Sequence, residues 1–388
     1  MSGVPLSPAE LIREAAALLQ RGEGMAARAL FQQAVDAGEA GAWMGVAAAS
    51  RSLGDLPGEL AALDGVLAAR PGDLRALLLK GDRLTEAGEP RAAVAFYTAA
   101  LNGAPANPPP DLRATLARAQ AAVRRHASDY EAWLRAQLEP RLDGAATARF
   151  AQSLDLLFGR KSIYRQQPRI YYFPELPQTQ FYPRQACPWL DAPEAAAAAI
   201  TDELHAFLDD EAAPFEAYVQ AEANRPVDDR HWMLRDPDWT ALHLWKDGAP
   251  VAGVADRCPA VTEALANVPL CRTPGRTPTV LFSLLKPGAR IPPHTGYVNT
   301  RLICHLPLIV PPGCGFRVGN DTREWVEGRA WAFDDTIEHE AWNRGDGLRA
   351  ILIFDVWRPE LSAEERALVA AMFEAIDAYG GGAESWSV

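Results

Sequence analysis

Two histidines and an arginine in the C-terminal half of the chain are spaced so that they could form a metal-dependent site. His294 and His339 lie 45 residues apart, and Arg349 follows His339 by ten positions at the head of the apolar run 350–354. Neutral imidazoles bind divalent first-row metals, and a ligand set with open positions suits non-haem Fe(II). The sequence therefore predicts an iron site built from residues that are distant along the chain.

The position of Arg349 indicates that a carboxylate also binds at this site. An oxo acid such as 2-oxoglutarate chelates iron through its keto acid end, and its distal carboxylate then needs a buried cation. Arginine offers a fork of donors that binds a carboxylate in a bidentate manner. The alternative is a surface ion pair between Arg349 and Asp346. We expect Fe(II) as cofactor, with 2-oxoglutarate and O2 as cosubstrates.

The usual third ligand of such an iron site is missing from the sequence. An Asp or Glu commonly stands two residues after the first His, and here that position is Gly296. Three interpretations remain open: water completes the site, Asp334 or Asp335 reaches the metal, or the site does not hold iron.

Short apolar segments surround these residues and are separated by Gly- and Pro-rich turns. The segments of strand length are 280–285, 301–310, 315–318, 331–333 and 348–357. Many short strands with regular turn signals are typical of a β-sandwich or barrel. The sequence therefore predicts a compact all-β barrel that brings His294 and His339 together.

A longer string of residues extends around the two histidines. It comprises His294-Thr295-Gly296, Asn299-Thr300-Arg301-Leu302, His305-Leu306, Trp325, Glu327-Gly328, Phe333-Asp334-Asp335, Glu338-His339-Glu340, Trp342, Arg349, Asp355-Val356-Trp357 and Pro359-Glu360-Leu361. This string resembles the aspartyl/asparaginyl β-hydroxylases, and the resemblance covers about residues 171–361. It implies an Fe(II)- and 2-oxoglutarate-dependent oxygenase with a double-stranded β-helix fold, of the jelly-roll or cupin-like type. The family also carries Gly at the position of Gly296.

The resemblance implies roles for further residues of the pocket. Ser283 would help Arg349 to hold the distal carboxylate of 2-oxoglutarate, and His305 would contact its chelating end. Trp245 would line the cosubstrate site. The alternatives are a structural histidine at position 305 and a core tryptophan at position 245.

Arg301 marks a departure from the family pattern. Relatives often carry a second Arg two residues further on, and here that position is Ile303. Arg301 could therefore serve the substrate, the cosubstrate or neither.

The substrate class stays open at this point. The family name suggests the β-carbon of an Asp or Asn residue in a peptide or protein, but relatives also hydroxylate lipid acyl chains, so a lipid or small molecule is the alternative. A halide in place of the missing carboxylate ligand would make a halogenase. A non-catalytic repeat adaptor with a degenerate barrel is the other class, but such a barrel has no physical reason to keep His294, His339 and Arg349.

The N-terminal residues 1–105 are rich in Ala and Leu and repeat themselves. Glycines recur at spacings of 32 and 34 residues, at Gly22, Gly54 and Gly88. A larger apolar residue follows each glycine by nine positions, at Phe31, Leu63 and Tyr97. The period resembles tetratricopeptide repeats, in which a small residue lets paired helices approach and a larger one fills the groove between them. An Ala-rich helical bundle is the alternative, and either module would serve as a partner-binding or dimerising surface.

The remaining chain divides into a connector and the barrel domain. Residues 106–165 read as a helical connector, with helices expected over 112–125 and 145–158. Residues 166–388 would form the double-stranded β-helix domain, covered by a C-terminal helix over 362–379.

Composition excludes several classes of protein. The 388 residues suggest two or three domains, and a net charge of −12 without a basic stripe argues against a nucleic-acid partner. No run approaches the roughly 18 apolar residues of a membrane span. Because residues 1–13 show no signal pattern, we expect a cytoplasmic protein. The five cysteines include no CxxC pair, and Cys258 and Cys271 could pair or remain free.

Overall fold

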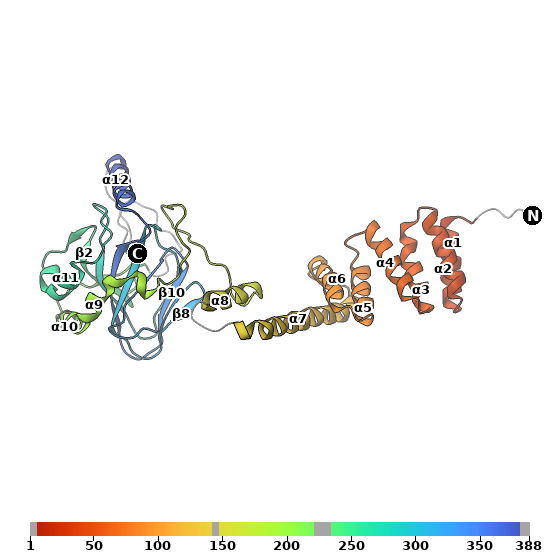
Figure 1. Ribbon diagram of the computed structural model, residues 1–388, viewed down its shortest axis with the longest axis horizontal. Coiled ribbons are helices and arrows are strands. Elements are labelled where there is room, and N and C mark those ends of the chain that lie inside the picture. Colours follow the sequence, from red (N-terminus) through yellow and green to blue (C-terminus); the bar gives the residue numbers. More distant parts are fainter. Residues whose placement is uncertain (1–5, 142–146, 221–233, 381–388) are drawn as a thin grey trace, which may run out of the picture. The chain divides into compact units, whose positions relative to one another are not determined.

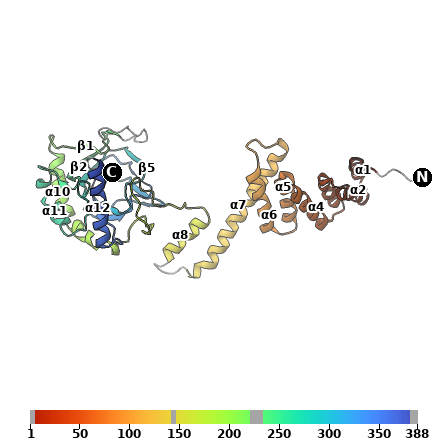
Figure 2. The same cartoon turned by 90° about the horizontal axis from the view of Figure 1, so that it is seen from above.

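The computed structural model describes residues 6–141, 147–220 and 234–380 of the chain. It divides into two compact units, residues 1–158 and residues 159–388 (Figures 1 and 2). The boundary falls inside the stretch expected to be a connector, because the helices of that stretch belong to the first unit and its last residues to the second.

The first unit consists of helices that pack against their neighbours in sequence. They are α1 (Pro8–Gln20), α2 (Gly24–Asp36), α3 (Trp43–Ser52), α4 (Leu56–Ala69), α5 (Leu74–Glu86), α6 (Pro90–Gly103), α7 (Pro110–Leu138) and α8 (Thr147–Leu157), with 3-10 turns at Ala40–Ala42 and Glu139–Arg141. The closest pairs are α1 with α2, α3 with α4, and α5 with α6, while α7 packs on α6. The predicted N-terminal helical repeats are therefore confirmed.

The recurring glycines have a different role from the one expected of a small residue between helices. Gly22, Gly54 and Gly88 have positive φ angles and no neighbour in the space of a Cβ, so they end helices in the left-handed conformation. Close approach occurs instead at Gly45 and Gly81. A Cβ at these two positions would overlap with the rings that fill the groove, Phe31 and Tyr97.

The second unit contains two antiparallel sheets. The larger has the strand order β1-β2-β4-β11-β6-β9, with β3 paired to β2, and the smaller has the order β5-β10-β7-β8. The strands are β1 (Glu216–Ala217), β2 (Trp239–Lys246), β3 (Ala249–Pro250), β4 (Val280–Leu285), β5 (Arg290–His294), β6 (Arg301–Ile309), β7 (Cys314–Val318), β8 (Asp321–Arg323), β9 (Trp331–Phe333), β10 (His339–Asn343) and β11 (Arg349–Trp357). The predicted double-stranded β-helix is confirmed.

Both faces of the larger sheet are buried, which explains why its strands are almost continuously apolar. One face packs on α9 (Asp191–Ala195), α10 (Ala197–Leu208) and α11 (Pro259–Leu265), and the other faces the smaller sheet. Along β4, side chains alternate between the two faces: Phe282 and Leu284 join the core under the helices, while Leu281, Ser283 and Leu285 point the other way.

Further segments cover the barrel. Helix α12 (Ala363–Gly380) packs through Val369 and Phe373 against Leu176 and Trp357. Short 3-10 turns lie at Arg184–Ala186, Pro188–Leu190 and Ala255–Arg257. All five cysteines are buried and free, so Cys258 and Cys271 do not pair.

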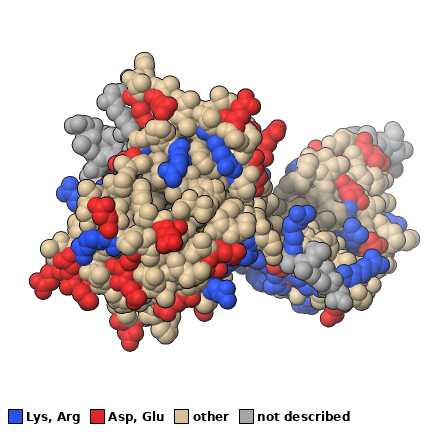
Figure 3. All heavy atoms as spheres, turned by 60° about the vertical axis from the view of Figure 1, so that its left-hand side comes forward, with Lys and Arg blue, Asp and Glu red and all other residues tan. Residues whose placement is uncertain are grey.

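Charged side chains of both signs are mixed on the visible surface of the second unit (Figure 3). On the face of the second unit shown in Figure 3, Lys and Arg side chains are scattered among Asp and Glu and form no continuous basic patch. Within the described ranges, no helix has the length and apolar character needed to cross a membrane.

Candidate active site

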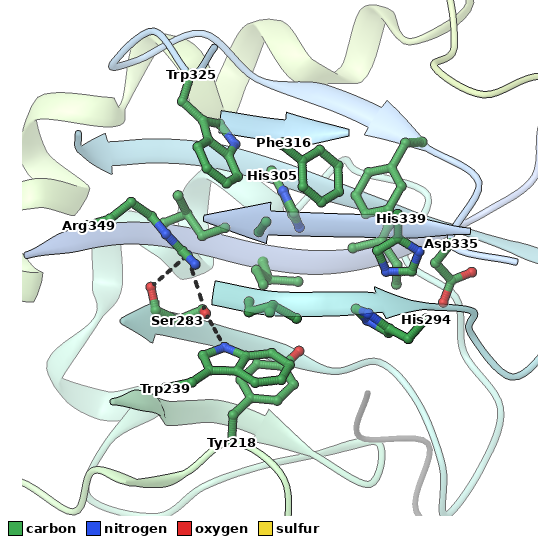
Figure 4. A pocket seen from close by; sticks show the side chains of 16 residues that line it. Tyr218, Trp239, Ser283, His294, His305, Phe316, Trp325, Asp335, His339 and Arg349 are labelled. Atoms are coloured by element: carbon green, nitrogen blue, oxygen red, sulfur yellow. Dashed lines mark hydrogen bonds between the residues drawn. The ribbon is translucent and has the colours of Figure 1, made fainter. Parts of the chain in front are cut away.

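A pocket opens between the two sheets of the second unit (Figure 4). Apolar and aromatic side chains form most of its wall, and a few polar groups converge on its interior. The lining residues are Tyr218, Trp239, Ser283, Ile291, His294, Ile303, His305, Phe316, Trp325, Phe333, Asp335, His339, Ala341, Arg349, Ile351 and Ile353. A largely apolar pocket with convergent polar groups is the usual form of a small-molecule site.

The two predicted metal ligands meet at one end of this pocket. His294 ends β5 and His339 begins β10, and the two are direct partners in the antiparallel register. Their ring centroids lie 4.1 Å apart. The sheet pairing thus brings together two residues that are 45 positions apart in the sequence.

The hydrogen bonds of both rings suit metal binding. Nδ1 of His294 lies 2.8 Å from the Pro292 carbonyl oxygen, and Nδ1 of His339 lies 3.1 Å from that of Ile337. Because a carbonyl oxygen only accepts, each Nδ1 carries the proton, and the lone pair of the neutral ring is on Nε2. Burial, together with the neighbouring His294, lowers the pKa of His339 well below its usual value, so this ring is neutral. The pair therefore fits a divalent metal.

Asp335 occupies the space that a side chain at position 296 would need. A Cβ on Gly296 would overlap with the Asp335 carboxylate, and the Gly296 amide donates to the Asp335 carbonyl at 2.7 Å. Neither carboxylate oxygen has a hydrogen-bond partner among the described residues, and the nearest cation is Arg301, at 3.8 Å. Burial raises the pKa of Asp335 to about 7.

The other acidic candidate, Asp334, points away from the pocket. Its carboxylate accepts hydrogen bonds from Arg358 and Thr336 and does not line the site. In the described part of the chain, no group of three or more His, Cys, Asp or Glu side chains is gathered closely enough to hold a metal. The protein therefore offers two imidazoles with one carboxylate, Asp335, beside them.

Arg349 lies at the opposite end of the pocket from the histidine pair (Figure 4). Its side chain is 1% exposed, and Nη1 lies 3.4 Å from both the carbonyl oxygen and Oγ of Ser283. Among the residues that the structure describes, no carboxylate comes within 4.0 Å of this guanidinium, so a surface pair with Asp346 is excluded. Burial lowers the pKa of Arg349 to about 10.

Two aromatic residues that the sequence did not single out support this end of the pocket. Trp239 donates from Nε1 to Oγ of Ser283 at 3.2 Å, and the Tyr218 ring stacks on Trp239 with centroids 4.0 Å apart. The predicted pocket residue Trp245 is not there. A register irregularity between His243 and Trp245 turns Trp245 toward the core under the helices.

His305 and Arg301 have different positions relative to the pocket. His305 lines it between the rings of Phe316 and Phe333, and its buried Nδ1 has no hydrogen-bond partner among the residues that the structure describes. Burial, with Arg349 nearby, lowers its pKa well below the usual value. Arg301 does not line the pocket; it is fully buried and pairs with Asp355 at 2.8 Å. Its guanidinium approaches the pocket residue Asp335 at 3.8 Å.

The fold and the paired histidines define a double-stranded β-helix protein with a two-histidine pocket, and comparison with known proteins agrees. Residues 194–359 match the family model described as Aspartyl/Asparaginyl beta-hydroxylase. The second unit is thus related to the aspartyl/asparaginyl β-hydroxylases, as the motif string predicts.

Individual relatives match parts of the chain. The human Aspartyl/asparaginyl beta-hydroxylase is 37% identical over 137 residues, which are 35% of this chain and 18% of that protein. The human Aspartate beta-hydroxylase domain-containing protein 2 is 30% identical over 222 residues, 56% of this chain and 57% of the relative. Among solved structures, PcrH from Pseudomonas aeruginosa is 22% identical with a TM-score of 0.28, over 31% of this chain and 94% of its own.

Proposed function

We propose that the second unit is an Fe(II)- and 2-oxoglutarate-dependent hydroxylase. The observation that carries the proposal is a buried guanidinium, Arg349, with no carboxylate within reach among the described residues, in the same pocket as the paired histidines His294 and His339. A buried positive charge without a negative charge beside it is unfavourable, so a site that keeps one is suited to an anionic ligand. The relatives named as β-hydroxylases support the reaction type.

Each polar group of the pocket then has a role. His294 and His339 would hold the iron, and Arg349 with Ser283 would bind the distal carboxylate of 2-oxoglutarate. His305, whose Nδ1 lacks a partner, would hydrogen-bond the chelating end. When bound, iron, 2-oxoglutarate and O2 supply oxidative hydroxylation of the substrate, with release of succinate and CO2.

The apolar wall has a separate role. Phe316 and Phe333 lie against the imidazoles of His305 and His339, and Trp325 lies against His305, so these rings would keep water away from them. Excluding water strengthens the pairing of charged groups and limits side reactions of reactive species.

For the substrate, the proposal follows the family: an Asp or Asn residue of a peptide or protein, recruited by the helical repeats of the first unit. A lipid acyl chain or a small molecule is the alternative substrate. If the substrate is a peptide, removal of the repeats should lower the rate of peptide hydroxylation but leave the uncoupled turnover of 2-oxoglutarate unchanged.

The test is anaerobic addition of Fe(II) and 2-oxoglutarate to the full chain. A weak visible absorption band from metal-to-ligand charge transfer should form in the wild type, and His294→Ala and His339→Ala should each abolish it together with iron binding. The matched control is His205→Ala, because His205 lies exposed on α10. No band in iron-loaded wild-type protein would favour a repeat adaptor with an inactive barrel.

A further inference from the structure

Residues 159–171, here called the strap, are hydrogen-bonded to both loops that carry the histidines. Within the strap, the Gln167 amide donates to the Thr336 carbonyl at 2.7 Å, and the Arg169 amide donates to the Gly296 carbonyl at 3.0 Å. Thr336 is three residues before His339, and Gly296 is two residues after His294. One short segment therefore holds the backbone next to each proposed metal ligand.

Gln166 makes the same connection with its side chain. It is 7% exposed and is the one buried side chain of the strap. Its Nε2 donates to Oδ2 of Asp334 at 2.6 Å and to the Pro177 carbonyl at 3.0 Å, and its Oε1 accepts from Nδ2 of Asn299 at 2.9 Å. Because a carboxylate only accepts, the orientation of the amide is determined by its partners.

Two of the three side-chain partners of Gln166 belong to the two histidine-bearing loops. Asp334 lies in the turn between β9 and β10, next to the pocket residue Asp335, and Asn299 lies between β5 and β6. The amide of Gln166 thus forms a bridge of two hydrogen bonds between the loop after His294 and the loop before His339.

Asp334 is the more heavily bonded end of this bridge. Besides Gln166, it accepts from Arg358 Nη2 at 3.0 Å and from the Thr336 backbone amide at 3.0 Å, and it is fully buried. A buried polar network in which every member is satisfied is rigid, whereas loss of one member leaves a desolvated group without a partner. Removing the Gln166 amide would therefore loosen both loops at once.

We propose that Gln166 is a positioning residue that sets the spacing of the two histidine-bearing loops and thereby the metal affinity of the pocket. The β5–β10 pairing puts His294 and His339 in register, and beyond these strand ends the two loops are held by groups outside the ligands, among them Gln166. Such outer groups typically change metal affinity by about 10–100-fold. Gln166 lies outside residues 194–359, the part that matches the family model, so this support comes from a segment of the chain beyond that match. The inference rests on the proposed function for the identity of the site.

The experiment measures binding of Co(II), an air-stable probe of histidine sites, to the full-length protein by visible absorption. Gln166→Ala and Gln166→Met should each weaken Co(II) binding by about 10–100-fold. Gln166→Met retains the length and packing of the side chain, so it decides the matter if the alanine variant folds poorly. The matched control is Gln167→Ala, since the Gln167 side chain is exposed and its bond to Thr336 is made by the backbone.

The outcomes separate the positioning role from the metal site itself. Wild-type Co(II) affinity in Gln166→Met, with or without a lower unfolding midpoint of the metal-free protein, would overturn the positioning role. Wild-type Co(II) binding that does not depend on His294 would overturn the proposed function instead. A selective loss of affinity, with the metal-free midpoint close to that of Gln167→Ala, supports the inference.

Discussion

Replacing Arg349 by alanine is expected to weaken 2-oxoglutarate binding by two to three orders of magnitude. Burial lowers the pKa of Arg349 from 12.5 to about 10, which corresponds to about 3 kcal/mol of unfavourable free energy for the charged form. A bound carboxylate would offset this cost, and breaking a buried ion pair typically costs about 3–5 kcal/mol. Since about 1.4 kcal/mol is a factor of ten in affinity, the loss is about 10²–10³-fold.

The assay is anaerobic titration of 2-oxoglutarate into iron-loaded protein, followed by the visible absorption band. Arg349→Lys should recover part of the affinity because lysine keeps the charge but not the fork. Arg344→Ala is the control, because Arg344 is an exposed arginine five residues away. Iron affinity should be unchanged in every variant, since both histidines are retained.

The stability of the metal-free protein gives a second expectation: a substitution of Arg349 that weakens 2-oxoglutarate binding should not destabilise the fold. Arg349→Met keeps most of the side-chain volume and removes a buried charge that has no carboxylate within reach among the described residues. Its free energy of unfolding should therefore equal or exceed that of the wild type. Unchanged 2-oxoglutarate affinity in Arg349→Ala, or a clear loss of stability in Arg349→Met, would refute the reasoning, because the guanidinium would then be a structural group.

Three further predictions concern other parts of the second unit. Burial lowers the pKa of His243 to about 4, and a histidine of the unfolded chain titrates near 6.5, so the unfolded state binds more protons between these values. The free energy of unfolding should therefore fall by up to about 3 kcal/mol as the pH falls through this window. Urea unfolding at pH 7 and pH 4.5 should show a smaller fall in His243→Gln than in the wild type. Gly296→Ala should lower the free energy of unfolding by about 1 kcal/mol or more, because the new methyl group overlaps with Asp335. The same substitution should cost less in a protein that already carries Asp335→Ala. If a double-mutant cycle showed equal costs in both backgrounds, the overlap would be contradicted. The fragment 159–388 should fold alone and bind Co(II) like the full chain, because no apolar core cluster of the described residues crosses its boundary.

The strands of the site could be predicted because their pattern is strong. The expected segments 280–285 and 348–357 correspond to β4 and β11, which begin and end within one residue of the expectation. Alternation along a strand then places Ser283 and Arg349 on the face toward the smaller sheet. The alternation puts both side chains on one face, but it does not say which face is inward, and the role of Ser283 is implied by the family resemblance.

The assignment of Trp245 to the pocket is wrong because the alternation of side chains is interrupted in β2. A single irregularity in a strand reverses the face of every later residue, and β2 has one between His243 and Trp245. Trp239, which precedes it, lines the pocket. The sequence of β2 itself, Trp239–Lys246, contains no glycine that would mark the irregularity, so the alternation could not show which tryptophan points inward.

The strap could not be predicted from any periodicity, because it forms neither a helix nor a strand. Its contacts join Gln166 to residues 133 and 168 positions away, and hydrogen bonds of that range leave no signal in local sequence. The boundary expected between residues 165 and 166 divides this stretch, with residues 159–165 in the connector and Gln166 at the start of the barrel domain. The structure shows that polar residues in such a stretch can satisfy buried groups of the neighbouring barrel.

The charges in the pocket explain how two histidines and one arginine could suffice for the proposed site. A divalent metal on His294 and His339 would add two positive charges to a pocket in which Arg349 already carries one, and the imidazoles contribute none. 2-Oxoglutarate would bring two negative charges and place one at each end. Asp335, beside the histidines, is the one acidic residue lining the pocket in the described chain, and its pKa of about 7 without metal means that a nearby cation would favour its charged form. Metal, cosubstrate and Asp335 would then together bring the pocket close to neutrality, so each of the two ligands should increase the affinity of the other.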